Sequence, residues 1–110
     1  IRLIVGITQD GRVIGVRAVQ HNETPGLGDA IETAKSDWIL GFDDRALDDD
    51  TRWALRREGG DIDAITGATI TSRAVINAVA AGLAWFETNR DRVFKVEMAT
   101  AAVDSQGAGL

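Results

Sequence analysis

The sequence predicts an α+β fold, in which an antiparallel sheet built from hairpins packs against one long C-terminal helix. Residues 1–8 and 12–20 are rich in Val and Ile and flank a short turn, which favours a hairpin. Apolar and charged residues alternate over 51–57, and a glycine pair then leads to 61–65, which predicts a second hairpin. Residues 71–89 carry apolar side chains at helical spacing, so we expect them to form the helix.

The composition fits a single soluble domain and excludes several functions. The chain has 110 residues, of which 45% are hydrophobic and 26% charged. Its net charge of −5 argues against nucleic-acid binding, which requires a basic face. The absence of Cys removes iron–sulfur clusters and zinc–thiolate sites, so any redox chemistry needs an organic cofactor. No run of about 18 apolar residues predicts a membrane span, and no signal peptide is recognisable.

Turn-forming residues indicate where the elements of the first half of the chain begin and end. The Asp10-Gly11 pair suits the positive φ angles of a tight hairpin turn. Residues 21–28 contain a proline and two glycines and predict an irregular loop, in which backbone amides are free to face a ligand. Residues 29–35 have weak helical character, with Asp29 as a possible cap, and Ser36 can cap a second short helix over 38–40.

The second half predicts further elements around the main helix. Five aspartates within 42–50 indicate a solvated surface loop, because they lack the spacing of a calcium loop. We expect a closing strand over 92–100, one domain over 1–103 and a flexible tail over 104–110. The chain begins without Met, so we expect a fragment that lacks its natural N-terminal portion. The apolar stripe of the helix consists of Val75, Ile76, Val79, Leu83 and Phe86.

Several hydroxyl groups crowd the predicted start of the long helix. The run from Asp63 to Thr69 reads DAITGAT, and Thr71 and Ser72 follow closely. A helix N-terminus leaves four amide hydrogens unpaired and carries about half a positive charge, so it favours an anion such as phosphate. The alternative is that Thr69 or Thr71 only caps the helix.

Two motifs resemble a known family in the same order along the chain. The pattern Asp63-x-x-Thr66-Gly67-Ala68-Thr69 resembles the flavinylation motif of the FMN-binding domain family. The loop 23–28, which reads ETPGLG, and the nearby residues 35–38 resemble one branch of that family. That branch contains the G subunit of the Rnf-type ion-translocating electron transport complex and is related to the C subunit of the sodium-pumping NADH:quinone reductase. The resemblance covers about residues 1–86.

The resemblance implies an FMN that is held covalently through a phosphoester on Thr69. It assigns no catalytic residue and no metal ligand, and it implies an electron carrier without an independent substrate site. Whether the protein is itself an enzyme stays open. The residues that the resemblance places around the cofactor are Asp63, Thr66, Gly67 and Ala68 at the phosphate, and Glu23, Thr24, Gly26, Leu27 and Gly28 at the isoalloxazine ring.

The resemblance also implies partners and a location. A separate flavin transferase would install FMN from FAD, because Thr69 has only Asp63 nearby as a possible base. The family pattern implies other complex subunits and a membrane anchor, missing here, at the periplasmic face of the bacterial inner membrane. Two alternatives are a covalent-FMN domain of a regulatory or reductase protein and a cofactor-free structural domain. Trp38, Trp53 and Trp85 are either packing residues or flavin stackers, and His21 is either a surface residue or a ligand.

Overall fold

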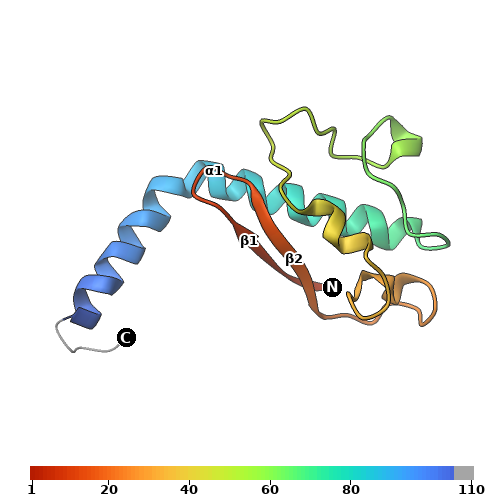
Figure 1. Ribbon diagram of the computed structural model, residues 1–110, viewed down its shortest axis with the longest axis horizontal. Coiled ribbons are helices and arrows are strands. Elements are labelled where there is room, and N and C mark those ends of the chain that lie inside the picture. Colours follow the sequence, from red (N-terminus) through yellow and green to blue (C-terminus); the bar gives the residue numbers. More distant parts are fainter. Residues whose placement is uncertain (106–110) are drawn as a thin grey trace.

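The computed structural model describes residues 1–105, and their side chains as far as Val93. Two strands, β1 (Arg2–Ile7) and β2 (Val13–Gln20), form an antiparallel sheet, and the helix α1 (Thr69–Ser105) lies beside it (Figure 1). Three short 3-10 helices lie between them in the sequence. They are η1 (Gly28–Ile31), η2 (Trp38–Phe42) and η3 (Arg56–Glu58). The predicted α+β class is confirmed, with one hairpin in place of two.

The first hairpin forms where its turn chemistry predicted it. Ile7 pairs with Val13, and the connecting turn places Gly11 at φ 87°, which is a left-handed conformation that glycine adopts without strain. The amide of Thr8 donates to the carbonyl of Arg12 over 2.8 Å and closes the turn. The alternating side chains of β2 bury Val13 and leave Ile14 exposed, so one face of the sheet meets the core.

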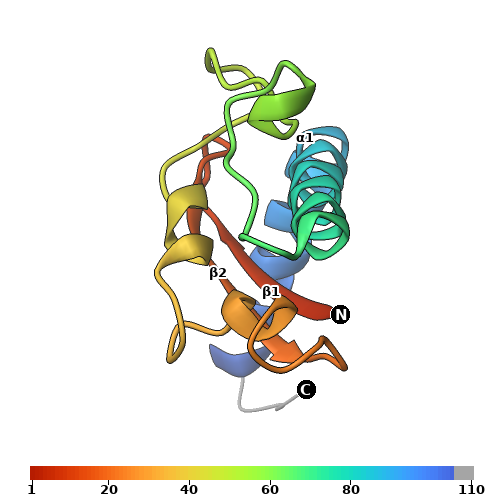
Figure 2. The same cartoon turned by 90° about the vertical axis from the view of Figure 1, so that its right-hand side faces the viewer.

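The core lies between the first half of α1 and the remaining elements. Figure 2 shows the helix on one side, with the hairpin and the short helices facing it. The predicted stripe of the helix is buried, and Phe42 and Leu55 pack into the same cluster from the connecting segments. The buried residues of the stripe are Val75, Ile76, Val79, Leu83 and Phe86. Burying a side chain of this kind contributes about 1.5–3 kcal/mol, so this stripe fixes how α1 sits on the sheet.

The tryptophans divide between the core and the surface. Trp38 packs edge-to-face on Phe42 with ring centroids 5.4 Å apart, and Trp53 stacks on the same phenyl ring at 6.1 Å. Both are therefore packing residues, as one of the two alternatives predicted. Trp85, in contrast, is 59% exposed on α1.

The predicted second hairpin is wrong. Residues 51–65 contain only a single parallel bridge between Leu55 and Ile62, and the chain turns through η3. The Asp61 carboxylate accepts a hydrogen bond from the amide of Arg52 over 2.7 Å, which occupies a backbone donor that a strand ladder would need. The apolar alternation over 51–57 therefore reflects two inward-facing residues of a loop, Trp53 and Leu55, rather than a strand.

The predicted closing strand over 92–100 is also wrong, because α1 continues through it to Ser105. This segment is rich in residues with good helix propensity, such as Lys, Glu, Met and Ala, which favours continuation of the helix. The helix begins at Thr69, two residues before the predicted start. Of the predicted tail, residues 104–105 are helical and 106–110 lie outside the described part of the chain. Within residues 1–105, no helix has the length and apolarity required to cross a membrane.

Neither predicted cap of the two short helices forms. The N-cap of η2 is Asp37, without a side-chain cap hydrogen bond, and Ser36 precedes it, with its Oγ accepting the amide of Trp38 over 3.1 Å. Asp29 does not cap the first, because η1 begins one residue earlier and forms no side-chain cap. The weak helical pattern of 29–35 thus yields only a four-residue 3-10 helix.

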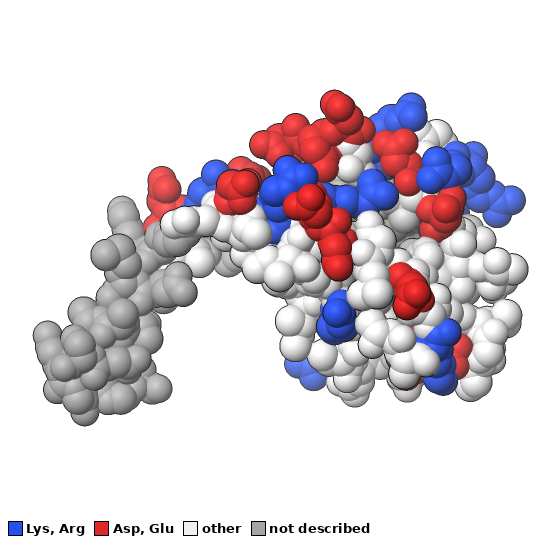
Figure 3. Space-filling model, viewed as in Figure 1, with Lys and Arg blue, Asp and Glu red and all other residues white. Residues whose placement is uncertain are grey.

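Charged side chains gather over the segment that connects the short helices. Figure 3 shows acidic and basic groups mixed along the edge that this segment occupies. Arg12 pairs with Asp44 at 3.0 Å, and Arg52 pairs with Asp61 at 3.3 Å. The acidic stretch 42–50 is the predicted surface loop, although Phe42 within it is buried. Since both signs alternate, this face does not form the basic surface that a nucleic acid needs.

Candidate functional site

The start of α1 is shaped by a buried serine. Ser72 Oγ donates to the carbonyl of Ala68 and accepts the amide of Ile65, both over 2.8 Å. These two bonds tie the preceding loop to the first turn of the helix. Among the described residues, neither Thr69 nor Thr71 makes a side-chain hydrogen bond to a backbone group at the helix start. Neither threonine therefore caps the helix, although the alternative interpretation predicted it.

The chain enters the helix through a glycine that no other residue could replace without strain. Gly67 has φ 76°, which is the left-handed region. A Cβ placed on Gly67 would lie 2.9 Å from Leu27 Cδ2, which is closer than van der Waals contact allows. The loop around Leu27 and the helix entry are therefore in close contact, although 40 residues of sequence separate them.

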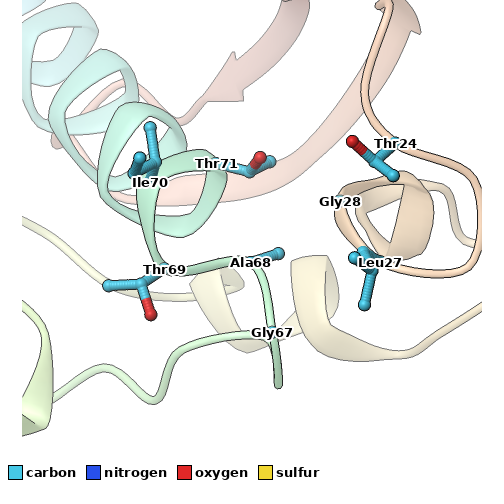
Figure 4. Close-up of a pocket in the computed structure, with 8 residues that line it drawn as sticks. All are labelled: Thr24, Leu27, Gly28, Gly67, Ala68, Thr69, Ile70 and Thr71. Carbon is cyan, nitrogen blue, oxygen red and sulfur yellow. The ribbon is translucent and has the colours of Figure 1, made fainter.

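A pocket of about 390 Å³ lies between this helix start and the predicted loop. The volume falls in the range of about 300–1,000 Å³ that is typical of small-molecule sites. Figure 4 shows Leu27 and Ala68 facing each other across the pocket, whereas the side chain of Thr69 extends away from the loop. The pocket is lined by Thr24, Leu27, Gly28, Gly67, Ala68, Thr69, Ile70 and Thr71.

The structure brings together most of the residues that the two motifs singled out. Six of them line the pocket: Thr24, Leu27, Gly28, Gly67, Ala68 and Thr69. Glu23 reaches the pocket wall indirectly, because its carboxylate accepts a hydrogen bond from Thr71. Gly26 forms the turn of the loop at φ 78° and does not line the pocket. Asp63 and Thr66 lie outside it and are exposed.

Two lining residues, Ile70 and Thr71, were not predicted as cofactor contacts. Ile70 is 80% exposed, although it is a large apolar residue on the first turn of a helix. The sequence carried a signal for it, because Ile70 falls outside the apolar stripe that faces the core. An exposed apolar side chain at the mouth of a pocket is suited to cover a ring system.

The first turn of α1 has the electrostatic character of an anion site. It contains no acidic residue, and no described group accepts the amide hydrogens of Thr69, Ile70 and Thr71. These amides and the helix dipole favour a phosphate group by about 0.3–1 kcal/mol. Small residues at 67 and 68 leave the approach open, and Leu27 and Ile70 offer apolar contact for a ring. The residues present therefore fit a flavin nucleotide.

Asp63 is held on the outer side of the motif by two contacts. Its carboxylate lies 2.6 Å from Arg56 Nε, and its carbonyl accepts the indole hydrogen of Trp38 over 2.7 Å. The hydrogen bond and charge of Asp63 raise the pKa of Arg56, so this guanidinium stays protonated. Asp63 thus lines a separate cavity of about 240 Å³ together with Trp38.

An ion pair follows the pocket loop in the sequence, and its contribution to stability depends on pH. Asp29 is almost fully buried, and Lys35 Nζ lies 2.6 Å from its Oδ2. The hydrogen bond from Lys35, with a second from the backbone amide of Gly26, lowers the pKa of Asp29. Its folded pKa therefore lies below the unfolded value of about 3.9, and the stability it contributes is present above that pH and lost as the pH falls through the folded pKa.

We expect Lys35→Met to remove most of this acid sensitivity, because the buried carboxyl then has no cationic partner. The measurement is urea unfolding at about pH 7 and about pH 3, on either side of the reference pKa. The variant should lose stability mainly at the higher pH. Arg57→Met is the matched control, since Arg57 is exposed and forms no ion pair with any residue whose side chain is described. Equal pH dependence in Lys35→Met and the control would contradict the assignment.

The titratable groups with described side chains do not cluster as metal ligands. Among the residues with described side chains, no group of three or more His, Cys, Asp or Glu is arranged to hold a metal ion. His21 directly follows β2, and its side chain is partly exposed, at 14%, with Nε2 2.8 Å from Glu32 Oε2. The strand-end position agrees with one of its two alternatives, although the side chain is more covered than that of a typical surface residue.

The fold and the pocket define a class of protein, namely a small α+β domain with a pocket, between a loop and a helix N-terminus, whose lining suits a nucleotide cofactor. The sequence profile of the family described as FMN-binding domain matches residues 1–84. The chain therefore belongs to the FMN-binding domain family, and the cofactor for which the pocket is suited is FMN.

Curated relatives agree with this family. The chain is 52% identical over 101 residues to the G subunit of the ion-translocating oxidoreductase complex of Pseudomonas aeruginosa strain UCBPP-PA14, covering 90% of this chain and 47% of that protein. It is 51% identical over 92 residues to the protein of the same name from Shewanella loihica, covering 82% and 43%. The Cronobacter sakazakii protein is 56% identical over 81 residues, covering 72% and 39%. The chain thus spans less than half the length of these relatives.

Proposed function

We propose that this chain is the flavin-carrying part of an electron-transfer subunit, in which FMN is attached through a phosphoester on Thr69. The observation that carries the proposal is the pocket, which joins residues 67–69 of the helix start to residues 24, 27 and 28 of the distant loop. FMN supplies reversible electron transfer when it is bound. The chain's own residues hold, orient and cover it.

In this proposal, residues 67–69 of the motif have a different role from Asp63 and Thr66. Gly67, Ala68 and Thr69 line the pocket and present the helix amides, so they form the phosphate cradle. Asp63 and Thr66 are exposed outside the pocket, where a separate flavin transferase can reach them as a recognition element. Leu27 and Gly28, with Thr24, then contact the ring, while Glu23 and Gly26 shape the loop.

The environment of Thr69 supports modification by a separate enzyme. The Thr69 hydroxyl has no hydrogen bond to a carboxylate or imidazole within the described residues, and Asp63 is engaged with Arg56. A threonine without a base is a poor nucleophile. In the transfer, the Thr69 oxygen forms a bond to the FMN phosphorus of FAD, the pyrophosphate bond of FAD breaks, AMP leaves and the hydroxyl proton is released. The base for that proton belongs to the transferase.

The biological setting follows from the relatives by analogy. Their names describe a subunit of an ion-translocating oxidoreductase complex. We infer that this chain works with the other subunits of such a membrane-bound, Rnf-type complex, at the periplasmic face of the bacterial inner membrane. An N-terminal anchor of the natural protein would hold it there. A covalent link suits a carrier that exchanges electrons with several partners, because the cofactor cannot dissociate between them.

Redox titration of the flavinylated protein tests this function. We expect the visible flavin absorbance to bleach on stepwise reduction and to return fully on reoxidation, since a carrier must cycle without loss of cofactor. The absorbance should stay with the protein after denaturation and gel filtration, because the link is covalent. Flavin that separates from the denatured chain would argue against the phosphoester, and protein that never binds flavin would argue for a cofactor-free domain.

A further inference from the structure

Glu23 occupies an unexpected position between the loop and the helix. Its carboxylate oxygen Oε1 accepts a short hydrogen bond from the Thr71 hydroxyl across 48 residues of sequence. Both side chains are partly buried. This is the one side-chain hydrogen bond, among the residues whose side chains are described, that joins the loop 23–28 to the first turn of α1. The bond therefore joins the loop to a residue, Thr71, that lines the pocket.

His21 accepts a hydrogen bond from the backbone of the same glutamate. The Glu23 amide donates to His21 Nδ1 over 3.1 Å, so that nitrogen is the acceptor and carries no hydrogen. The other ring nitrogen, Nε2, lies 2.8 Å from Glu32 Oε2 and donates to it. The groups therefore form one chain of hydrogen bonds, from Glu32 through His21 and Glu23 to Thr71 at the pocket.

Gly28 shows how close the loop lies to the helix at the Glu23–Thr71 hydrogen bond. A Cβ built on Gly28 would lie 2.8 Å from Thr71 Oγ1 and 3.0 Å from Glu23 Cβ. The loop backbone therefore meets the Glu23–Thr71 pair directly, with no room for a side chain. A contact of this kind sets the spacing between the two walls of the pocket.

We propose that Glu23 and Thr71 are positioning residues that clasp the flavin loop to the helix start and thereby set the width of the FMN pocket. The role of His21 is to hold the Glu23 backbone in place. This inference rests on the proposed function only in its consequence for FMN, because the clasp is formed by the chain's own residues. Glu23 then acts through the loop, and the ring contacts come from Leu27 and its neighbours.

Hydrogen exchange of the cofactor-free chain tests the clasp independently of flavin. Thr71→Val keeps the shape of the side chain and removes the hydroxyl, whereas Thr71→Ser keeps the hydroxyl. We expect Thr71→Val to speed exchange over residues 24–30 by about fivefold, which corresponds to the loss of about 1 kcal/mol for one hydrogen bond. Thr71→Ser should exchange like the wild type. Equal exchange in Thr71→Val and the wild type would overturn the clasp.

The partner residues supply matched variants. Glu23→Gln retains an oxygen that can accept from Thr71 and should resemble the wild type, while Glu23→Ala should resemble Thr71→Val. His21→Phe should speed exchange of the Glu23 amide itself. Thr88→Val, farther along α1, is the control and should leave the loop unchanged. Unchanged protection of the helix core in each variant separates a loosened loop from a failure to fold, and Glu23→Ala decides the question if Thr71→Val does not fold.

Iodide quenching of flavin fluorescence tests the consequence for the pocket. In flavinylated protein, Thr71→Val should give a larger quenching constant than Thr71→Ser, because a loosened loop exposes the ring to solvent. Equal quenching constants would overturn the role in setting pocket width. If the chain never gains FMN, the proposed function fails, and the exchange result by itself decides whether Glu23 and Thr71 form a clasp.

Discussion

Replacing Thr69 with alanine is expected to abolish covalent attachment of FMN completely. Alanine has no hydroxyl, so it offers no oxygen to the phosphorus, whatever the pocket around it still binds. The measurement is the intact mass after co-expression with a flavin transferase. The wild type should gain the mass of one FMN less one water, and Thr69→Ala should keep the mass of the unmodified chain. Thr69→Ser, which restores the hydroxyl, should be modified.

The helix provides a control for this experiment. Thr88 is an exposed threonine of α1 whose hydroxyl donates to the carbonyl of Ala84, so Thr88→Ala should be flavinylated like the wild type. The start of α1 also contains a competing hydroxyl, because Thr71 lines the same pocket. A mass gain that survives in Thr69→Ala and disappears in Thr71→Ala would move the tether to Thr71. An unmodified wild type would leave the site as a pocket without a covalent role.

Gly60→Ala is expected to destabilise the fold more than a Gly→Ala change at any other glycine among the described residues. A Cβ on Gly60 would lie 1.9 Å from the carbonyl oxygen of Ala54 and 2.6 Å from its Cα. Both atoms belong to the backbone, so no side-chain rotation can relieve the clash. We expect a loss of at least about 3 kcal/mol in the free energy of unfolding, which is the upper range for overpacking. Urea denaturation measures it.

The matched control is a glycine with open space around it. Gly41 has no heavy atom within 4 Å of a built Cβ, and it is not among the glycines of positive φ. Gly41→Ala should therefore change the unfolding free energy by no more than about 0.5 kcal/mol, as for an ordinary surface substitution. Similar losses in both variants would show that the turn at Gly60 relaxes without cost. A large loss at Gly60 alone would confirm that the backbone contact with Ala54 is rigid.

Local sequence patterns were sufficient for the elements whose partners are close in the chain. The hairpin of β1 and β2 formed as predicted because an Asp-Gly turn and Val-rich flanks favour the same register. The stripe from Val75 to Phe86 became the buried face of α1, since its period matches that of a helix. Residues 67–69 do line a pocket at the start of α1, where the sequence predicted a phosphate cradle.

Alternation of apolar residues was insufficient over 51–65. A strand requires a partner that supplies backbone donors and acceptors, and residue patterns do not show which partner is available. Here the Asp61 side chain accepts the hydrogen bond of the Arg52 amide, and the segment forms a loop around Leu55. For residues 92–100, good helix formers favoured the continuation of α1 in place of the predicted strand.

The sequence by itself determined the fold class, the main hairpin, the helix and the two motifs that mark an FMN-binding domain. Only the tertiary structure decided which motif residues meet. Packing of α1 on the sheet brings the loop at Leu27 to Gly67, whereas it turns Asp63 outward to Arg56. It also joins Glu23 to Thr71. The physical reason is that periodicity and turn chemistry are local properties, while contacts between distant segments depend on how the buried faces pack together.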